Sequence, residues 1–546
     1  MERVLPKTVD YLDVLPRAIP AERKRKKFYP ANGTQYTEGQ TIIIELADPR
    51  HFLDPSNSYL QFTYTNLTGQ SMSFDFGGGD TLIRNLRVHQ AGNQIMDIQE
   101  YNRLMCGIIN PVFHNRYKEN EGTLNNMSAG DTNITVALGR TNATAGADNT
   151  SGKNSGSVYT LAGNAAAAAA DRGMLADGES VVFSIPLTGG LFSQAKLIPL
   201  PLLREPIQVI LDLETNIQRL GVYGADPVAG NGYRISNVSY VSELIDVPRD
   251  VLSMLRQVQE MNGGSLLIQA NSFEFNNGNI PAGSTGEVIV NIPTRKKSIK
   301  SVLFCGQGPP TSLTTGFSDV AGMTATGEFS AYTLSQSSNF LLRSYQIKAG
   351  SLVHPPQPVR GPGGLGQNGL NFNGQPNCEL ARGEPAEELS KAFGFLGTTI
   401  GNGILNTLTY APIKRTAPIA GGGATVVAVG SDMVKLDGTP IVRIRDITGG
   451  TGARAAAPPN ELTASGRPSN MEFAPFGLDF EAFQKEAVNS GLNTESLALS
   501  MDLVLDIDNP SAVAGERQEQ QVNLDIYTWY DIIYYINMDG TITYSQ

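Results

Sequence analysis

One short run of the sequence carries five consecutive cations. Arg23, Lys24, Arg25, Lys26 and Lys27 follow an N-terminal stretch and precede the first predicted strand. Such a run can attract nucleic-acid phosphates or lipid head groups, although the attraction weakens steeply with salt. The alternatives are a solvated flank or a handle for acidic patches on neighbouring molecules. The formal charge of −11 argues against a general nucleic-acid binder.

Carboxylates recur in two similar phrases, VILDLETN at Val209–Asn216 and LVLDIDNP at Leu503–Pro510. Paired carboxylates can cleave glycosidic bonds. The segment DIDNP has the acidic character of a calcium loop, but it lacks the Gly and the distant Glu. Because the acids alternate with apolar residues on predicted strands, we expect them on a solvent or intersubunit face. The acids concerned are Asp212, Glu214, Asp506 and Asp508.

Other motifs of known chemistry are incomplete. RGPGGLG contains Gly361, Gly363 and Gly366 in dinucleotide-fingerprint spacing, but it neither follows a strand nor opens a helix. The four histidines, His51, His89, His114 and His354, are scattered, without the spacing of a zinc site. The sequence therefore predicts no catalytic residues, no cofactor and no metal, and a protein that is not an enzyme.

Length and composition indicate two β-rich domains. A chain of 546 residues exceeds what one core usually serves. The 58 Gly and 31 Pro indicate many turns between short strands. Charged residues make up 17%, against roughly 25% in an average soluble protein. Much of the surface is therefore expected to be neutral or covered by other subunits.

The sequence also predicts a cellular compartment. The three cysteines, Cys106, Cys305 and Cys378, lie far apart and fit a reduced intracellular environment. The N-terminus lacks the apolar core of a signal peptide. No apolar stretch reaches the roughly 18 residues of a membrane helix. We expect a protein that is made and assembled inside a cell.

The two similar phrases have matching neighbours. Each is followed by a β-rich strand with an acidic residue at the matching place, Glu243 in the first half and Asp531 in the second. Upstream, NGTQYTEGQTIIIEL parallels NGNIPAGSTGEVIVNI, with an Asn-Gly turn, a loop and a strand. Matches in the same order at both ends predict that one β-domain has been duplicated.

Each half contains about eight short strands, the number in a jelly roll. The predicted fold is all-β, two tandem eight-stranded jelly rolls with long loop insertions and a few short helices, of which residues 95–105, 385–395 and 479–491 are three. The predicted boundaries are an N-terminal arm over 1–27, a first jelly roll over 28–250 with a surface insertion near 118–178, a linker over 251–262, and a second jelly roll over 263–546 with Gly/Pro-rich insertions.

The chain resembles the double jelly-roll major capsid proteins of double-stranded DNA viruses, in the form found in polinton-like viruses and virophages. The resemblance is carried by FYPANGTQY with the strand TIIIEL, by FLDPSNSYLQFTY and by the aromatic end DIIYYINMDGTITYS. It implies a homotrimer whose six jelly rolls form a pseudo-hexagonal block, and long loops on the outer surface.

The resemblance predicts a structural protein of the virion whose trimers tile an icosahedral capsid. Its partners would be copies of itself, penton and minor or cement proteins, and the genome or an inner membrane through Arg23–Lys27. The alternative is a tandem β-sandwich that binds or hydrolyses carbohydrate. A stable monomer with hydrolase activity on glycans would favour that alternative.

Overall fold

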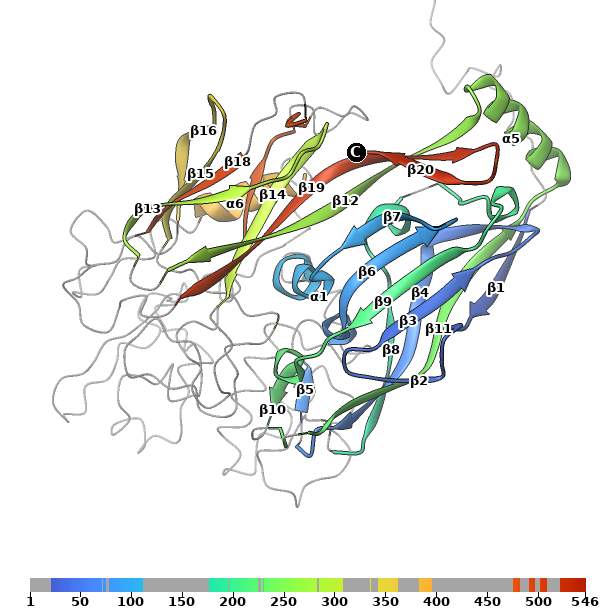
Figure 1. Cartoon of the computed structure of the whole chain (residues 1–546), viewed down its shortest axis with the longest axis horizontal. Coiled ribbons are helices and arrows are strands. Elements are labelled where there is room, and N and C mark those ends of the chain that lie inside the picture. The colour runs from blue at the N-terminus through green and yellow to red at the C-terminus, as the bar shows by residue number, and fades with distance from the viewer. Residues whose placement is uncertain are drawn as a thin grey trace, which may run out of the picture.

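The structure is a computed structural model of the chain. It describes residues 21–110, 175–307, 342–361, 383–394, 475–481, 491–495, 501–507 and 521–546 and Leu334, with short gaps at 71, 75–77, 176, 195, 224–226, 229 and 282–283. The strands form two bodies that lie side by side, one from each half of the chain (Figure 1).

The first half forms two antiparallel sheets. One has the order β1 (Glu22–Phe28), β11 (Gly232–Asp246), β4 (His51–Leu67), β8 (Ser180–Ile185), with β2 (Gln35–Thr37) also on β11. The other has the order β3 (Thr41–Leu46), β9 (Ile207–Leu213), β6 (Ile83–Gln90), β7 (Asn93–Ile98). Short additions are β5 (Met72–Phe74) paired with β10 (Gly221–Tyr223), and the helical turns η1 (Gly78–Leu82), η7 (Gly190–Phe192), η8 (Leu200–Leu202) and η9 (Ile217–Arg219).

The second half also forms two antiparallel sheets. One has the order β12 (Ser265–Ile280), β19 (Val522–Asn537), β14 (Ile299–Gln307), β17 (Phe476–Asp479), with β20 (Ile542–Ser545) on β19. The other has the order β13 (Gly286–Ile292), β18 (Met501–Ile507), β15 (Leu342–Ala349), β16 (Leu352–Arg360). The helices are α1 (Tyr101–Leu104), continued by the π-turn η2 (Met105–Ile109), α5 (Arg249–Met261) and α6 (Gly383–Ala392).

Both halves have one topology. When the eight long strands of each half are ranked from one to eight along the chain, both halves give sheets of order 1-8-3-6 and 2-7-4-5. In the first half these strands are β1, β3, β4, β6, β7, β8, β9 and β11, and in the second they are β12 to β19. Eight antiparallel strands in two facing sheets make a jelly roll. The predicted tandem of two jelly rolls is therefore confirmed.

The repeated phrase occupies the seventh strand of each jelly roll. Residue by residue, β9 and β18 have the same sequence of buried and half-buried positions. Each is flanked by the second and fourth strands of its own half. Alternation of apolar and polar residues puts one face of each strand into the core, as the sequence predicted.

A β-bulge recurs at the same place beside these strands. In β6 it lies between Ile83 and Asn85, opposite Leu213 and Asp212. In β15 it lies between Leu342 and Ser344, opposite the equivalent residues of β18, Ile507 and Asp506. The extra residue is an arginine in both halves, Arg84 and Arg343. Bulges persist within families because they set local twist, so this shared bulge fits duplication.

The sequence prediction about the basic run needs correction. Arg23–Lys27 does not precede the first strand; it lies within β1, the first strand of the first jelly roll. The reason is that β11 pairs with β1 residue by residue. Backbone pairing of this kind lets β1 form at the exposed edge of the sheet without apolar side chains of its own. Helix α5 spans most of the residues predicted as a linker, 251–262, and joins β11 to β12.

Two local predictions were wrong and one is confirmed. The helix expected over residues 95–105 begins only at Tyr101, because Ala91 and Gly92 both have positive φ and turn β6 back into β7 as a hairpin. The Asn-Gly turn expected at 277–278 lies inside β12. Helix α6 matches its prediction. The helix expected over 479–491 and the insertion near 118–178 both lie largely outside the described residues.

Substitutions in the seventh strands test the equivalence of the two jelly rolls. Leu211 and Leu505 occupy matching positions, and neither side chain is exposed. We expect Leu211→Ala and Leu505→Ala each to destabilise the protein by about 2–5 kcal/mol, because each leaves a cavity in its own core. Thermal unfolding of the purified protein measures this. Leu352→Ala, at a half-exposed site on β16, is the control and should change little; an equally large shift there would contradict the assignment.

Candidate assembly surfaces

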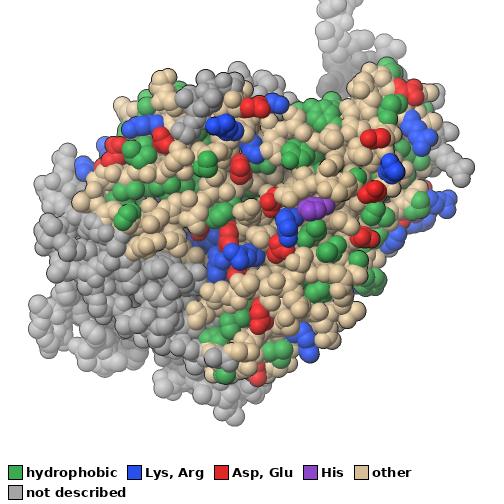
Figure 2. Space-filling model, in the orientation of Figure 1, with side chains coloured by type: hydrophobic (Ala, Val, Ile, Leu, Met, Phe, Trp, Pro, Cys, Tyr) green, Lys and Arg blue, Asp and Glu red, His purple; other side chains and the backbone are tan. Residues whose placement is uncertain are grey.

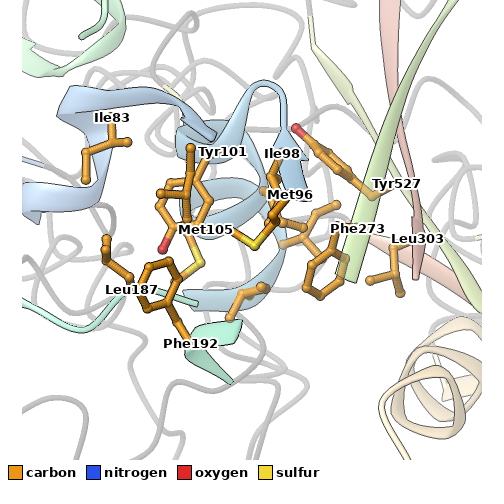
Figure 3. Packing of buried hydrophobic residues seen from close by; sticks show 14 of the residues in the cluster. Ile83, Met96, Ile98, Tyr101, Met105, Leu187, Phe192, Phe273, Leu303 and Tyr527 are labelled. Carbon is orange, nitrogen blue, oxygen red and sulfur yellow. The ribbon is translucent and has the colours of Figure 1, made fainter. Parts of the chain in front are cut away.

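The two jelly rolls share one hydrophobic core. A single cluster of buried side chains contains residues of both halves. At the junction, Met96 and Ile98 of the first half lie near Phe273 and Tyr527 of the second (Figure 3). The two halves therefore pack as one body through apolar burial, the main favourable term in such contacts.

A glycine allows this close approach. Gly190 has φ of +51°, and a Cβ there would lie 2.3 Å from Sδ of Met96 and 2.7 Å from the hydroxyl of Tyr534. A larger residue there would force the side chains of Met96 on β7 and Tyr534 on β19 to shift. Figure 1 shows β12 and β19 reaching from the second jelly roll over β7 of the first.

A fully buried arginine crosses the junction. Arg103, on α1, is 0% exposed, and its Nε donates to Asp525 on β19 at 2.9 Å. Its guanidinium also donates to the carbonyl oxygens of Gly306 on β14, at 3.3 Å, and of Leu334. Burial raises the pKa of the neighbouring Cys305 thiol to about 12, which keeps it uncharged and inert. Arg103 thus ties α1 to two strands of the other half.

Glu100 precedes α1 in a left-handed conformation, with φ of 48°. Its carboxylate accepts from Arg84 and Arg219, each at 2.9 Å, and its carbonyl accepts from the hydroxyl of Tyr527 at 2.8 Å. Burial alone would raise the pKa of Glu100, but the two arginines outweigh it and lower that pKa. A strained residue held by three side chains from both halves fixes the start of α1.

An open, polar cavity of about 580 Å³ lies beside this junction. Figure 2 shows Lys and Arg side chains gathered with Asp and Glu near the middle of the visible face. In the cavity wall Arg84 is paired with Glu100 at 2.9 Å, and Arg87 with Asp212 at 2.7 Å. Because these charges are already paired with one another, the cavity is a poor candidate for a ligand-binding site.

Three cations of the basic run lie next to carboxylates of β11 and of the loop that precedes β4. Arg23 pairs with Glu243 at 2.9 Å, Lys24 with Asp246 at 3.7 Å and Lys26 with Asp48 at 2.9 Å. The other two cations have neutral partners: Arg25 donates to the hydroxyl of Tyr59, and Lys27 donates to Gln61 at 2.9 Å. Three of the five positive charges are therefore compensated inside the protein.

Asp48 is the most buried carboxylate of this group, at 8% exposure. Burial alone would raise its pKa, but hydrogen bonds from Lys26, from the backbone of Arg50 and from His51 outweigh burial and hold the pKa well below its ordinary value. Its carboxylate lies 2.6 Å from Nδ1 of His51. The charged form of Asp48 therefore stabilises the packing of β1 against the loop that precedes β4.

The acids of the repeated phrases do not form one site. Glu214 was expected on an exposed face, but it is 1% exposed, because Arg219 at 3.0 Å and Asn102 at 2.8 Å satisfy its carboxylate. Asp212 binds Arg87, and Asp506 lies in the other half, 3.6 Å from Arg343. Asp508 lies outside the described residues. Sequence reasoning missed Glu214 and Arg103 as buried residues, since charge usually signals exposure.

Within the described ranges, no three His, Cys, Asp or Glu side chains are grouped closely enough to hold a metal ion. In the same part of the chain, no helix has the length and apolar character needed to cross a membrane.

Several large apolar side chains are exposed on the described surface. On α5, Met254, Val258 and Met261 are 61%, 42% and 83% exposed and follow one another at helical spacing. Val182 on β8 and Ile289 on β13 are more than half exposed as well. Single exposed apolar side chains such as Val182 and Ile289 are ordinary on a protein surface, so the row on α5 is the better candidate for a contact surface.

Comparison with solved structures gives the fold. Neither a family model nor a curated protein sequence matches the chain. The VP54 protein of the virus PBCV-1, in a crystal structure fitted into a cryo-EM reconstruction of the virophage Sputnik, is similar with a TM-score of 0.53 and 10% identity, over 98% of both chains. A chain in a quasi-atomic model of the PBCV-1 virus capsid gives 0.51 and 11% identity, again over 98% of both chains. Together with the strand order of the described residues, this likeness shows the double jelly-roll fold.

Removing the buried arginine tests the junction. We expect Arg103→Met to destabilise the protein by about 3–5 kcal/mol, because Asp525 is left buried without its partner. The double variant Arg103→Met with Asp525→Leu should recover part of this loss, since no buried charge remains. Thermal unfolding of the single and double variants measures the coupling. Strictly additive effects would contradict a direct ion pair across the junction.

The low pKa of Asp48 predicts a pH-dependent effect. Its folded pKa is below the unfolded value, so its contribution is full above about pH 4 and is lost as pH falls from there. We expect Asp48→Asn to lower the unfolding temperature at neutral pH, with the gap to wild type closing in acid. Glu22→Gln, on an exposed part of β1, is the control. A gap that stays constant down to pH 2 would contradict this assignment.

Proposed function

We propose that this chain is a major capsid protein, a tile that associates with copies of itself to form a virus shell. The observation that carries the proposal is the likeness, over 98% of both chains, to proteins that form the PBCV-1 virus capsid. The chain shares the complete tandem arrangement with them, and not merely one sandwich domain.

The physical form of the molecule suits a tile. Two jelly rolls with buried inner faces and a shared core make a stiff block. The buried Arg103–Asp525 pair and the contacts of Glu100 oppose hinging at the junction. A shell needs tiles whose edges keep a fixed relation to one another, and a rigid junction provides it.

The proposed assembly unit is a homotrimer. A closed ring of three copies presents six similar jelly rolls, so its outline is pseudo-hexagonal and can tile an icosahedral shell. Exposed apolar residues such as Met254 and Met261 on α5 are available to be buried in such contacts. The protein would then act in the virion after assembly inside the host cell, with penton and minor capsid proteins as further partners.

The carbohydrate-active alternative has less support. A glycosidase needs two carboxylates that face one substrate across a short distance. Asp212 is held by Arg87, and Glu214 is buried against Arg219 and Asn102. These acids are occupied in structural ion pairs, so they are poor candidates for acid or nucleophile. A non-enzymatic role is part of the proposal.

The oligomeric state of the purified protein tests the proposal. We expect a particle of three times the chain mass of 58.5 kDa by light scattering, with a hexagonal outline in electron micrographs. Concentrated protein should form sheets or closed shells. A stable monomer that hydrolyses glycans would overturn the proposal in favour of the alternative.

A further inference from the structure

Strand β1 forms an open edge of its sheet. It pairs with β11 in unbroken register from Glu22 opposite Asp246 to Phe28 opposite Tyr240. Among the strands that the structure describes, none pairs with its other side. Residues 22–27 are all exposed. A regular, exposed edge is a template for one more strand.

The backbone groups on the open edge belong to Arg23, Arg25 and Lys27. The N–H of Glu243 on β11 donates to Oγ of Ser58, which lies on the β4 side. Because successive residues of a strand point to alternate sides, the backbone of Ser242 points toward β1, where it faces Lys26. The hydroxyl of Ser242 accordingly donates to the carbonyl of Lys26. The residues on either side of Lys26 therefore direct their N–H and C=O groups outward.

The uncompensated charge lies on two of these same residues. Within the part of the chain that the structure describes, the side-chain partners of Arg25 and Lys27 are neutral, Tyr59 and Gln61. A strand added here would place its side chains next to these cations on one face and next to Lys24 and Lys26 on the other. Acidic side chains would gain from that position, since opposite charges on neighbouring strands attract.

The same charges exclude β1 of a second copy as the partner. Two β1 strands paired with each other would place cations opposite cations, which is destabilising. We propose that β1 is a docking strand, to which an acidic, extended segment of a partner polypeptide adds as a further strand of the sheet. This mode of recognition draws affinity from main-chain hydrogen bonds and specificity from alternating side chains.

The second jelly roll supports this assignment by contrast. Its own first strand, β12, is covered along part of its length by β7 and η7 of the first jelly roll. Lys196 of the first half also donates to the carbonyl of Leu267 on β12, at 2.9 Å. Of two equivalent strands, one is therefore used inside the chain, and the other is open and carries five cations. The inference does not depend on shell formation, because binding can be measured on the isolated protein.

The test uses a short labelled peptide of alternating Glu and Val and the full-length protein at low salt, with fluorescence anisotropy as readout. We expect Arg25→Gln to weaken binding about threefold, through lost charge alone. Arg25→Pro removes the same charge and also one outward N–H, while the ladder with β11 is kept, so it should weaken binding about tenfold more. The difference between the two variants isolates strand pairing.

Amide hydrogen exchange on the wild-type protein decides the question independently, even if Arg25→Pro fails to fold. The peptide should slow exchange at Arg25 and Lys27 and leave Lys24 and Lys26, already paired with β11, unchanged. Equal affinities for the two Arg25 variants, or no added protection, would overturn strand addition and leave only charge attraction. Tighter binding of a single-stranded DNA oligonucleotide, or of anionic vesicles, would reassign the run to phosphate groups.

Discussion

The fold depends on the burial of apolar faces in a core that does not stop at the boundary between the two halves. Each sheet has one face that must leave water, and each jelly roll covers most of that surface with its own second sheet. The remaining apolar surface, around Met96 and Phe273, is covered only when the halves meet. Burial of this kind is non-directional, so the directional contacts of Arg103 and Glu100 are needed to select one orientation. The apolar core supplies stability, and the buried polar contacts supply a single geometry.

Periodicity and repetition predicted the architecture well, because both can be recognised in the sequence without knowledge of which residues meet in the fold. The strand TIIIEL alternates between core and solvent, and its place in β3 follows from that pattern. The repeated phrase predicted equivalent strands, and β9 and β18 agree in burial and neighbours. The shared bulge at Arg84 and Arg343 was not foreseen, since a bulge depends on the register between strands that lie far apart in the chain.

The failures that concern charged residues have one common cause, which is that the partner of a charged residue cannot be identified from sequence. Arg23–Lys27 was expected outside the sheet because five cations in a row suggest solvent. The partners that make them a strand, Glu243 and Asp48, come from distant or separate segments. Glu214 and Arg103 are buried for the same reason: each is matched by groups that only the folded chain brings near. A charged residue can therefore be predicted as exposed only where the folded chain brings no opposite charge next to it.

Duplication also explains why the two ends of the molecule differ in the chemistry they offer. A single jelly roll has one first strand at the edge of a sheet, and that edge must be paired, covered or charged to prevent uncontrolled association. In the second copy the edge strand β12 is covered along part of its length by the first copy. Among the described strands none pairs with the outer side of β1, and the cations of β1 guard that edge against uncontrolled pairing. The same charge makes the strand selective, since it repels a second β1 and attracts an acidic one. A residue pattern that prevents aggregation therefore also defines which partner can bind.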